Sequence, residues 1–174
     1  MAEAPPRASP PHSRPSGAVS VRPASRKELP RILEIQKAAF RAECELTGDW
    51  GIEPMAQTLA GVEEDFEGSA VLVAAGPGGA ILGSVRAARV RGSVYVFRLS
   101  VDPARRRLGA GRSLMLAAEL ALPSPRYFLR TRKGNGPAEA LYLNLGYRVY
   151  KEEDGAGGIR FAFFEKHAEG NGAP

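Results

Sequence analysis

Residues 94–122 read VYVFRLSV, DPARRRLGAGR and SLMLAAELAL in succession, and the three pieces differ in character. The first is rich in β-branched and aromatic residues, which predicts a strand. The second is a basic turn spaced by glycines, and the third has the composition of a helix. A strand that enters a helix through a glycine turn leaves backbone N–H groups unpaired at the helix N-terminus. Those groups and the helix dipole predict an anion site, most often for phosphate.

The turn contains Arg106-Arg107-Leu108-Gly109-Ala110-Gly111, which has the form R-x-x-G-x-G. Gly109 and Gly111 remove side chains where a ligand would approach the backbone, and glycine tolerates a positive φ. The pattern is neither a Walker A loop nor a dinucleotide fingerprint, because the Lys-Ser/Thr of the first and the third glycine of the second are missing. An ordinary connection that needs glycine for its shape remains the alternative. The cations around the turn are Arg105, Arg106, Arg107 and Arg112.

With a second motif downstream, this stretch resembles the GNAT (N-acetyltransferase) superfamily. The first match is the strand 95–101, then Asp102-Pro103, then Arg106-x-x-Gly109-x-Gly111 opening a helix. The second is Asn135-Gly136-Pro137-Ala138-Glu139-Ala140-Leu141-Tyr142 followed by Leu145-Gly146-Tyr147. It looks like the family signature N-x-x-A-x-x-x-Y-x-x-x-G-[FY]. The two motifs occur in the family's order, and the resemblance covers about residues 19–166.

Composition limits the classes of function. A chain of 174 residues, 44% of them hydrophobic, fits a single folded domain. The formal charge of +5 is mild, and arginines clustered at one turn favour a phosphorylated ligand over nucleic acid as partner. The single cysteine allows no disulfide within the chain and fits the reducing cytoplasm. No apolar run reaches the length of a membrane span, so no membrane partner is expected.

The two ends of the chain differ from its middle. Residues 1–17 are rich in Pro, Ser and Ala and predict a disordered tail, and residues 169–174 predict a flexible C-terminus. The folded domain is expected over 18–168. His12 and His167 lie near the two ends without a plausible partner, so we expect neither a metal site nor a histidine-based triad.

Between the ends, the order of elements is expected to be β α α β β β α β α β β, with a mixed sheet of the α/β or α+β class. Ser25 and Glu28 have the spacing of a capping box before the first helix, and Pro30 moves the start of that helix toward itself. The resemblance implies a mostly antiparallel sheet of about six to seven strands flanked by about four helices. The expected helices are 26–40, 54–66, 113–122 and 137–145, with a polar connection at 43–53. The expected strands are 18–22, 70–75, 80–90, 93–101, 126–131, 147–152 and 160–166.

The resemblance implies acetyl-CoA as the cosubstrate. In the family, the strand that ends at Val101 splays from the next strand, here 126–131, and its free backbone groups bind the pantetheine amides. The pyrophosphate would lie on the N–H groups of residues 107–112. A backbone N–H at 99–101 would polarise the thioester oxygen. The implied cofactor-binding residues are Leu99, Ser100, Val101, Arg106, Arg107, Leu108, Gly109, Ala110, Gly111, Arg112 and Asn135.

Direct acetyl transfer needs an acid and a base. Tyr142 matches the family tyrosine that protonates the departing thiolate; its alternative is a core tyrosine with a satisfied hydroxyl. Asn135 matches the asparagine that contacts CoA, and its alternative is a turn or helix N-cap residue. The base is not specified, because each acidic side chain bordering the expected acceptor site has an exposed, solvated alternative. Those acidic candidates are Glu43, Glu45, Asp49 and Glu53.

Two arginines, Arg86 and Arg98, lie on otherwise apolar strands. They could hold a carboxylate or phosphate of the acceptor, or pair with a nearby Asp or Glu. Cys44 is expected to be a small buried filler.

The resemblance implies an N-acetyltransferase that acts on an amine of a small molecule or peptide, and a homodimer is common in the family. Two other functions remain open. One is a CoA-binding regulatory domain without turnover, and the other is a different phosphate-loop protein that binds nucleotides.

Overall fold

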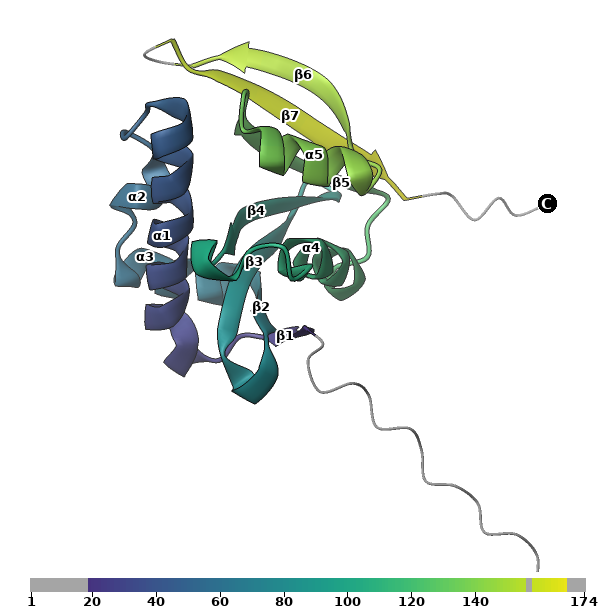
Figure 1. Ribbon diagram of the computed structural model, residues 1–174. Coiled ribbons are helices and arrows are strands. Elements are labelled where there is room, and N and C mark those ends of the chain that lie inside the picture. Colours follow the sequence, from purple (N-terminus) through teal and green to yellow (C-terminus); the bar gives the residue numbers. More distant parts are fainter. Residues whose placement is uncertain (1–18, 156–157, 169–174) are drawn as a thin grey trace, which may run out of the picture.

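The computed structural model describes residues 19–155 and 158–168, and its elements follow one another as in Figure 1. The expected tail at 1–17 and the C-terminus at 169–174 lie outside the described residues. The helices are α1 (Leu29–Thr47), α2 (Glu53–Ala56), α3 (Leu59–Gly68), α4 (Ala110–Ala121) and α5 (Gly136–Asn144). The strands are β1 (Ser20–Pro23), β2 (Ala70–Ala75), β3 (Ile81–Val90), β4 (Ser93–Val101), β5 (Arg126–Arg132), β6 (Arg148–Asp154) and β7 (Arg160–His167).

The strands form one seven-stranded sheet in the order β1-β2-β3-β4-β5-β7-β6. Every neighbouring pair is antiparallel except β4 and β5, which are parallel. A parallel pair needs a crossover connection, and α4 supplies it between these two strands. The mixed, mostly antiparallel sheet expected from the resemblance is confirmed, and the described residues contain five helices where about four are expected.

Helices cover both faces of the central strands. Successive side chains of a strand point to opposite faces, so one strand can contribute to two separate apolar clusters. On β2, Leu72 and Ala74 join the cluster that holds Leu114 of α4. Val71 and Val73 instead pack with Ile32 of α1 and its neighbours in a second cluster. Figure 1 shows α1 on one side of the sheet and α4 on the other. Each buried Leu or Ile in such a layer contributes about 1.5–3 kcal/mol, so both faces are held firmly.

The N-terminal helix is longer than expected. A 3-10 turn at Arg26–Glu28 precedes it, and α1 begins with Pro30 in its first turn, as the proline indicated. The expected end near Phe40 is wrong, because α1 continues to Thr47 and stops at Gly48, whose φ of 75° ends the helix in the left-handed conformation. The predicted polar connection at 43–53 is therefore largely helical, and it shrinks to residues 48–52.

The next expected helix, 54–66, is also wrong in outline, because it is split in two. The single turn α2 ends at Ala56, and α3 begins after Thr58. The Thr58 hydroxyl accepts the N–H of Gly61 at 3.3 Å and caps α3. The break places Gln57 between the helices, where its side chain reaches inward to Gln36.

The turn before α1 makes a pH-dependent contribution to stability. The Glu28 carboxylate accepts hydrogen bonds from Arg22 at 2.6 Å and from the backbone N–H of Ser25 at 2.8 Å. The Arg22 bond, with that of Ser25, lowers the pKa of Glu28 from 4.5 to about 2. A lowered carboxyl pKa adds stability that is complete above pH 4.5 and is lost as the pH falls toward 2.

We therefore expect Glu28→Gln to remove part of this acid dependence. The loss at pH 7 should be at most about 1 kcal/mol, because the pair with Arg22 is partly exposed. Urea unfolding at pH 7 and pH 3 measures it: the gap between wild type and variant should narrow at the lower pH. An equal gap at both pH values would contradict the assignment.

Candidate active site

The sheet opens between β4 and β5. In the described chain these strands pair through two residue pairs only, Val94 with Tyr127 and Tyr95 with Phe128. β4 then runs on to Val101, and β5 to Arg132, without further pairing between them. The splaying implied by the resemblance is therefore present. Beyond Tyr95, the edge of β4 that faces β5 therefore has no strand partner. A ligand that binds to a sheet edge as an added strand would need such an unpaired edge.

A β-bulge deforms β4 inside this opening. Arg98 has a φ of 54°, and the register with β3 shifts between the pairs Ser84–Ser100 and Arg86–Phe97. One residue of β4 is therefore extra, which turns the backbone that follows it. β3 approaches closely here, because a Cβ on Gly83 would lie 2.5 Å from the carbonyl oxygen of Ser100. The bulge thus changes the direction of the backbone of residues 99–101, which the sequence predicts to bind the cofactor.

The N-terminus of α4 has open backbone donors. Gly109 precedes the helix with a φ of 80°, and the first internal bond runs from Ser113 N–H to the Gly109 carbonyl at 3.0 Å. The amides of residues 110–112 come before that bond, and they have no acceptor among the residues that the structure describes. Gly109 uses the positive φ that glycine tolerates, whereas Gly111 is an ordinary helical residue whose added Cβ would lie 3.4 Å from Leu141 Cδ2. Gly111 therefore allows α5 to approach α4.

The basic turn before α4 has uncompensated charge. Residues 105–109 are exposed, and so is Arg112. Within the described residues, Arg105, Arg106, Arg107 and Arg112 make no ion pair, whereas Arg22, Arg86, Arg98, Arg126 and Arg132 each have a carboxylate partner. Arg107 also adopts a φ of 67°, which is unfavourable for a side chain other than glycine. Free donors, free cations and an open strand edge together fit the pyrophosphate and pantetheine of acetyl-CoA.

Tyr142 lies on α5 at the base of the opening. Its side chain belongs to the buried cluster of Val94, Val96 and Leu129, which come from the two splayed strands. The ring packs 5.5 Å from that of Phe164, and only 8% of the residue is exposed. Its hydroxyl makes no hydrogen bond to any described residue, and a catalytic role for Tyr142 stays a prediction. Burial, with the nearby Glu43 carboxylate and Tyr95, raises the pKa of Tyr142 far above 10.

Both the oxygen and the nitrogen of the Asn135 side-chain amide form hydrogen bonds within the fold. The side-chain oxygen accepts the N–H of Ala138 at 3.4 Å and caps α5. The Nδ2 atom donates to the Glu43 carboxylate at 2.9 Å, which joins α5 to α1. The N-cap alternative is therefore present in the structure, and a contact between Asn135 and CoA stays a prediction.

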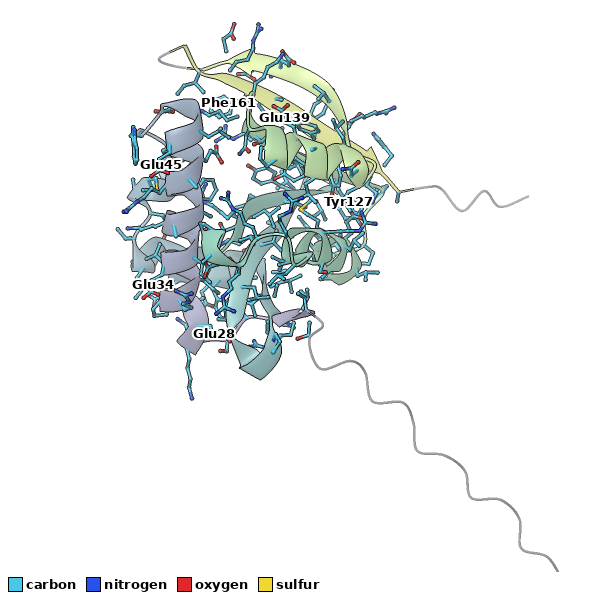
Figure 2. All side chains as sticks on the ribbon, in the orientation of Figure 1. Glu28, Glu34, Glu45, Tyr127, Glu139 and Phe161 are labelled. Atoms are coloured by element: carbon cyan, nitrogen blue, oxygen red, sulfur yellow. The ribbon has the colours of Figure 1, made fainter. Side chains whose placement is uncertain are left out.

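The four acidic candidates for the base lie in different surroundings. Glu43 is half-buried, and burial raises its pKa against the opposing effects of Arg132 and Asn135. Glu45 is exposed two residues further along α1 (Figure 2). Asp49 forms an ion pair with the buried Arg132, and Glu53 forms one with Arg98 at 2.8 Å.

The two strand arginines are both paired. Arg86 is 1% exposed and donates to Asp65 at 2.8 Å and to Gln57 at 3.2 Å, and burial lowers its pKa to about 10. Arg98 donates to Glu53. The pairing alternative is thus realised at each position. Cys44 is fully buried, as expected of a filler.

Two cavities of similar size lie near these groups. One, of about 360 Å³, borders the Arg132–Asp49 pair and is lined by Gly48, Asp49, Arg132, Lys133, Gly158, Ile159 and Arg160. The other, of about 370 Å³, borders Arg98 and is lined by Glu53, Ala56, Gln57, Thr58, Gly61, Glu64, Asp65 and Arg98. Sequence reasoning missed Arg132, because nothing in a basic strand end indicates that its side chain is buried.

The described residues contain no cluster of three or more His, Cys, Asp or Glu side chains placed to hold a metal ion. Within the same residues, no helix has the length and apolar character needed to cross a membrane.

Solved structures share this fold. PaiA N-acetyltransferase of Thermoplasma acidophilum, in complex with coenzyme A, is 16% identical with a TM-score of 0.72, covering 87% of this chain and 99% of its own. YncA of Salmonella typhimurium, with its cofactor acetyl-CoA, is 20% identical with a TM-score of 0.68, covering 90% and 97%. The ribosomal-protein-S18-alanine N-acetyltransferase of Escherichia coli is 17% identical with a TM-score of 0.71, covering 90% and 99%.

No curated protein matches the chain in sequence. The profile described as the acetyltransferase (GNAT) family, however, matches residues 29–147, which include the splayed strands, the basic turn, α4 and Tyr142. The chain belongs to the acetyltransferase (GNAT) family.

Proposed function

We propose that this protein transfers the acetyl group of acetyl-CoA directly to the nitrogen of an amine on a small molecule or a peptide. The observation that carries the proposal is the opening between β4 and β5. An unpaired strand edge and the free amides of α4 border this opening, and Tyr142, whose hydroxyl has no hydrogen-bond partner among the described residues, lies at its base. We also propose a cytoplasmic location, because a chain with a single cysteine needs no internal disulfide and fits a reducing compartment.

Each part of the opening has a role in binding. The amides of residues 110–112, with the dipole of α4, hold the pyrophosphate, and the unpaired arginines add charge-assisted contacts. The β4 edge from Leu99 to Val101 binds the pantetheine amides as a neighbouring strand would. Acetyl-CoA brings an activated thioester, and a β4 N–H next to the bulge at Arg98 stabilises the charge that develops on its oxygen.

Tyr142 acts on the leaving sulfur. Its raised pKa keeps the phenol protonated at any working pH, so the hydroxyl is always able to donate. Because this hydroxyl has no hydrogen-bond partner among the described residues, donation to a thiolate breaks no contact of the fold. No nucleophilic Cys or Ser is required, since the acceptor nitrogen attacks the thioester itself.

The test has a binding arm and a turnover arm. Calorimetry with acetyl-CoA should give a dissociation constant in the micromolar range. Release of CoA thiol is then measured with a linear polyamine, a free amino acid, a peptide with a free N-terminus and a lysine peptide blocked at its N-terminus. At least one amine should raise thiol release well above the rate without acceptor.

The two alternatives predict other outcomes. Tight binding without turnover on any amine would favour the regulatory CoA-binding domain. No binding by a folded protein would overturn the transferase assignment, and nucleotides would then be tested as ligands of the basic turn.

A further inference from the structure

The cavity of about 370 Å³ lies beside the proposed reaction centre. Its lining comes from α2, from the connection 57–58, from α3 and from Arg98 of β4. Arg98 lies in the β-bulge and directly precedes Leu99, the first residue of the segment that binds the pantetheine in the proposed function. A molecule in this cavity would therefore lie next to the β4 backbone at which the proposed transfer takes place.

The cavity is on the face of the sheet that α1 covers. Arg86 of β3 stands opposite Val71 in the register with β2, and Val71 packs with Ile32 of α1. The Arg86 side chain reaches Gln57 at 3.2 Å and Asp65 at 2.8 Å, and both of these residues line the cavity. Because α4 covers the opposite face, an acceptor in the cavity would approach the thioester from the side away from the pyrophosphate.

The guanidinium groups of Arg86 and Arg98 use only part of their donors. They are neighbours, since Arg86 pairs in register with Phe97. Arg86 is 1% exposed and bonds described residues through Nη1, whereas its buried Nε and Nη2 have no partner among them. The buried Nε of Arg98 has no partner in the described chain either. Buried charged donors without an acceptor are costly, so this pair of strands favours a ligand that supplies one.

Glu53 is a weak partner for Arg98. Its side chain is 72% exposed, and it stands on the single-turn helix α2. Its Oε1 accepts from Arg98 Nη2 at 2.8 Å, which leaves Nε unpaired. Nε and Nη2 form one edge of a guanidinium, and a carboxylate that bonds both atoms is bidentate and more strongly held. Since an exposed ion pair contributes little stability, a carboxylate that bonded both atoms would displace Glu53.

We propose that the acceptor binds in this cavity and that Arg98 holds a carboxylate group of it, a place that Glu53 occupies until the acceptor enters. The inference rests on the proposed function and names its substrate class, amines that also carry a carboxylate. Arg98 is then a specificity-determining residue. Arg86, which Asp65 and Gln57 hold in place beside it, adds positive charge behind the binding edge.

Carboxylates also line the cavity, and they favour an acceptor of the opposite charge. Asp65 is already paired with Arg86, and Glu53 with its exposed side chain is paired on the rim. Glu64 is exposed on α3 and makes no ion pair with a described residue. Solvent screens an exposed charge, whereas the unused arginine donors are buried, so we expect the arginines to decide the preference. A cationic acceptor is the competing outcome that the test includes.

The test compares three acceptors with the same five-carbon chain: 5-aminopentanoate, pentylamine and 1,5-diaminopentane. They differ at the end away from the reacting amine, which is a carboxylate, a methyl group or an ammonium group. The kcat/KM for 5-aminopentanoate should exceed that for pentylamine about tenfold or more, the usual gain from hydrogen bonds between charged groups. If wild type uses none of the three, each is measured as an inhibitor of the amine that it uses fastest, and 5-aminopentanoate should inhibit most strongly.

Two substitutions in one ion pair should have opposite effects. Arg98→Gln removes the cation, so the preference for 5-aminopentanoate over pentylamine should fall about tenfold or more. This preference is a ratio, which cancels any general effect on folding or chemistry. Glu53→Gln removes the competing carboxylate, so the KM for 5-aminopentanoate should fall about two- to fivefold, in line with the small contribution of an exposed pair. A pair that only stabilised the fold would move both variants in the same direction.

Arg91→Gln is the matched control. Arg91 lies in the exposed turn that joins β3 to β4, at the end of the two strands away from the bulge. This variant loses the same charge and should keep the wild-type preference, with circular dichroism showing that all variants are folded. If Arg98→Gln does not fold, Glu53→Gln decides, because an unchanged or raised KM contradicts the competition between Glu53 and the acceptor.

The outcomes separate this inference from the proposed function. Equal kcat/KM or inhibition constants for the three compounds would overturn the carboxylate site and leave the transferase assignment intact. So would a preference for 1,5-diaminopentane, which would assign the selectivity to the acidic lining. A folded Arg98→Gln variant with the wild-type preference would also contradict the inference. If wild type turns over no amine at all, both proposals fail.

Discussion

Replacing Tyr142 with phenylalanine should lower kcat by about 100-fold or more, which is the usual range for loss of a general acid. The acetyl-CoA dissociation constant should stay within about twofold, because the ring and its packing on Phe164 are kept. The free energy of unfolding should also change little. The Tyr142 hydroxyl makes no hydrogen bond to a described residue, so its removal breaks none there. Initial rates, calorimetry and urea unfolding on one preparation measure all three.

Tyr147→Phe is the matched control for this prediction. Its hydroxyl donates to Glu119 at 2.9 Å in the same buried cluster. Losing that bond should cost about 2 kcal/mol of stability, since the acceptor is charged, while kcat stays near wild type. A variant Tyr142→Phe that loses stability but keeps its kcat would assign Tyr142 to the core instead of the reaction.

Gly111→Glu should reduce acetyl-CoA binding by at least about 100-fold, which corresponds to about 2.7 kcal/mol. The change puts a carboxylate beside the open amides of residues 110–112, where the pyrophosphate is expected to lie. Repulsion between the two anions and loss of space at the backbone act together. The backbone allows the substitution, because Gly111 has no positive φ and its added Cβ would make ordinary contacts, at 3.4 Å with Leu141 and at 3.7 Å with Val101.

Gly68→Glu provides the control for an added negative charge. Gly68 ends α3, has no positive φ, and an added Cβ there meets nothing within 4 Å. This variant should bind acetyl-CoA as wild type does, with circular dichroism showing that both variants are folded. Equal binding by Gly111→Glu and wild type would show that the basic turn does not hold the pyrophosphate.

Strand limits could be predicted closely because turn residues flank buried runs. The strands 70–75 and 93–101 agree with β2 and β4 residue for residue. The end of α1 was misplaced because Arg41, Glu43 and Glu45 resemble a polar loop. The spacing of buried and half-buried residues in fact continues from Gln36 through Phe40 to Cys44, and Gly48 is the stop signal.

Some parts of the candidate site can likewise be predicted from the sequence, and others cannot. The glycine turn and Tyr142 were found because short motifs carry them. The surroundings of Glu43 were not, since Asn135 is 92 residues away along the chain and Asp49 is 83 residues from Arg132. Burial, which separates Glu43 from Glu45, is a property of the assembled fold. No local pattern in the sequence distinguishes those two glutamates.

The short parallel contact between β4 and β5 also has a consequence for how the protein loosens. Two residue pairs join the half-sheet β1–β4 to the half-sheet formed by β5, β7 and β6. Between the halves, the backbone hydrogen bonding is therefore sparse, and their coupling depends mainly on the buried cluster that Val96, Leu129 and Phe164 share. A cosubstrate lying along the gap would touch both halves. Its binding energy would add to that coupling, and saturation with acetyl-CoA would then slow amide exchange in the two half-sheets together.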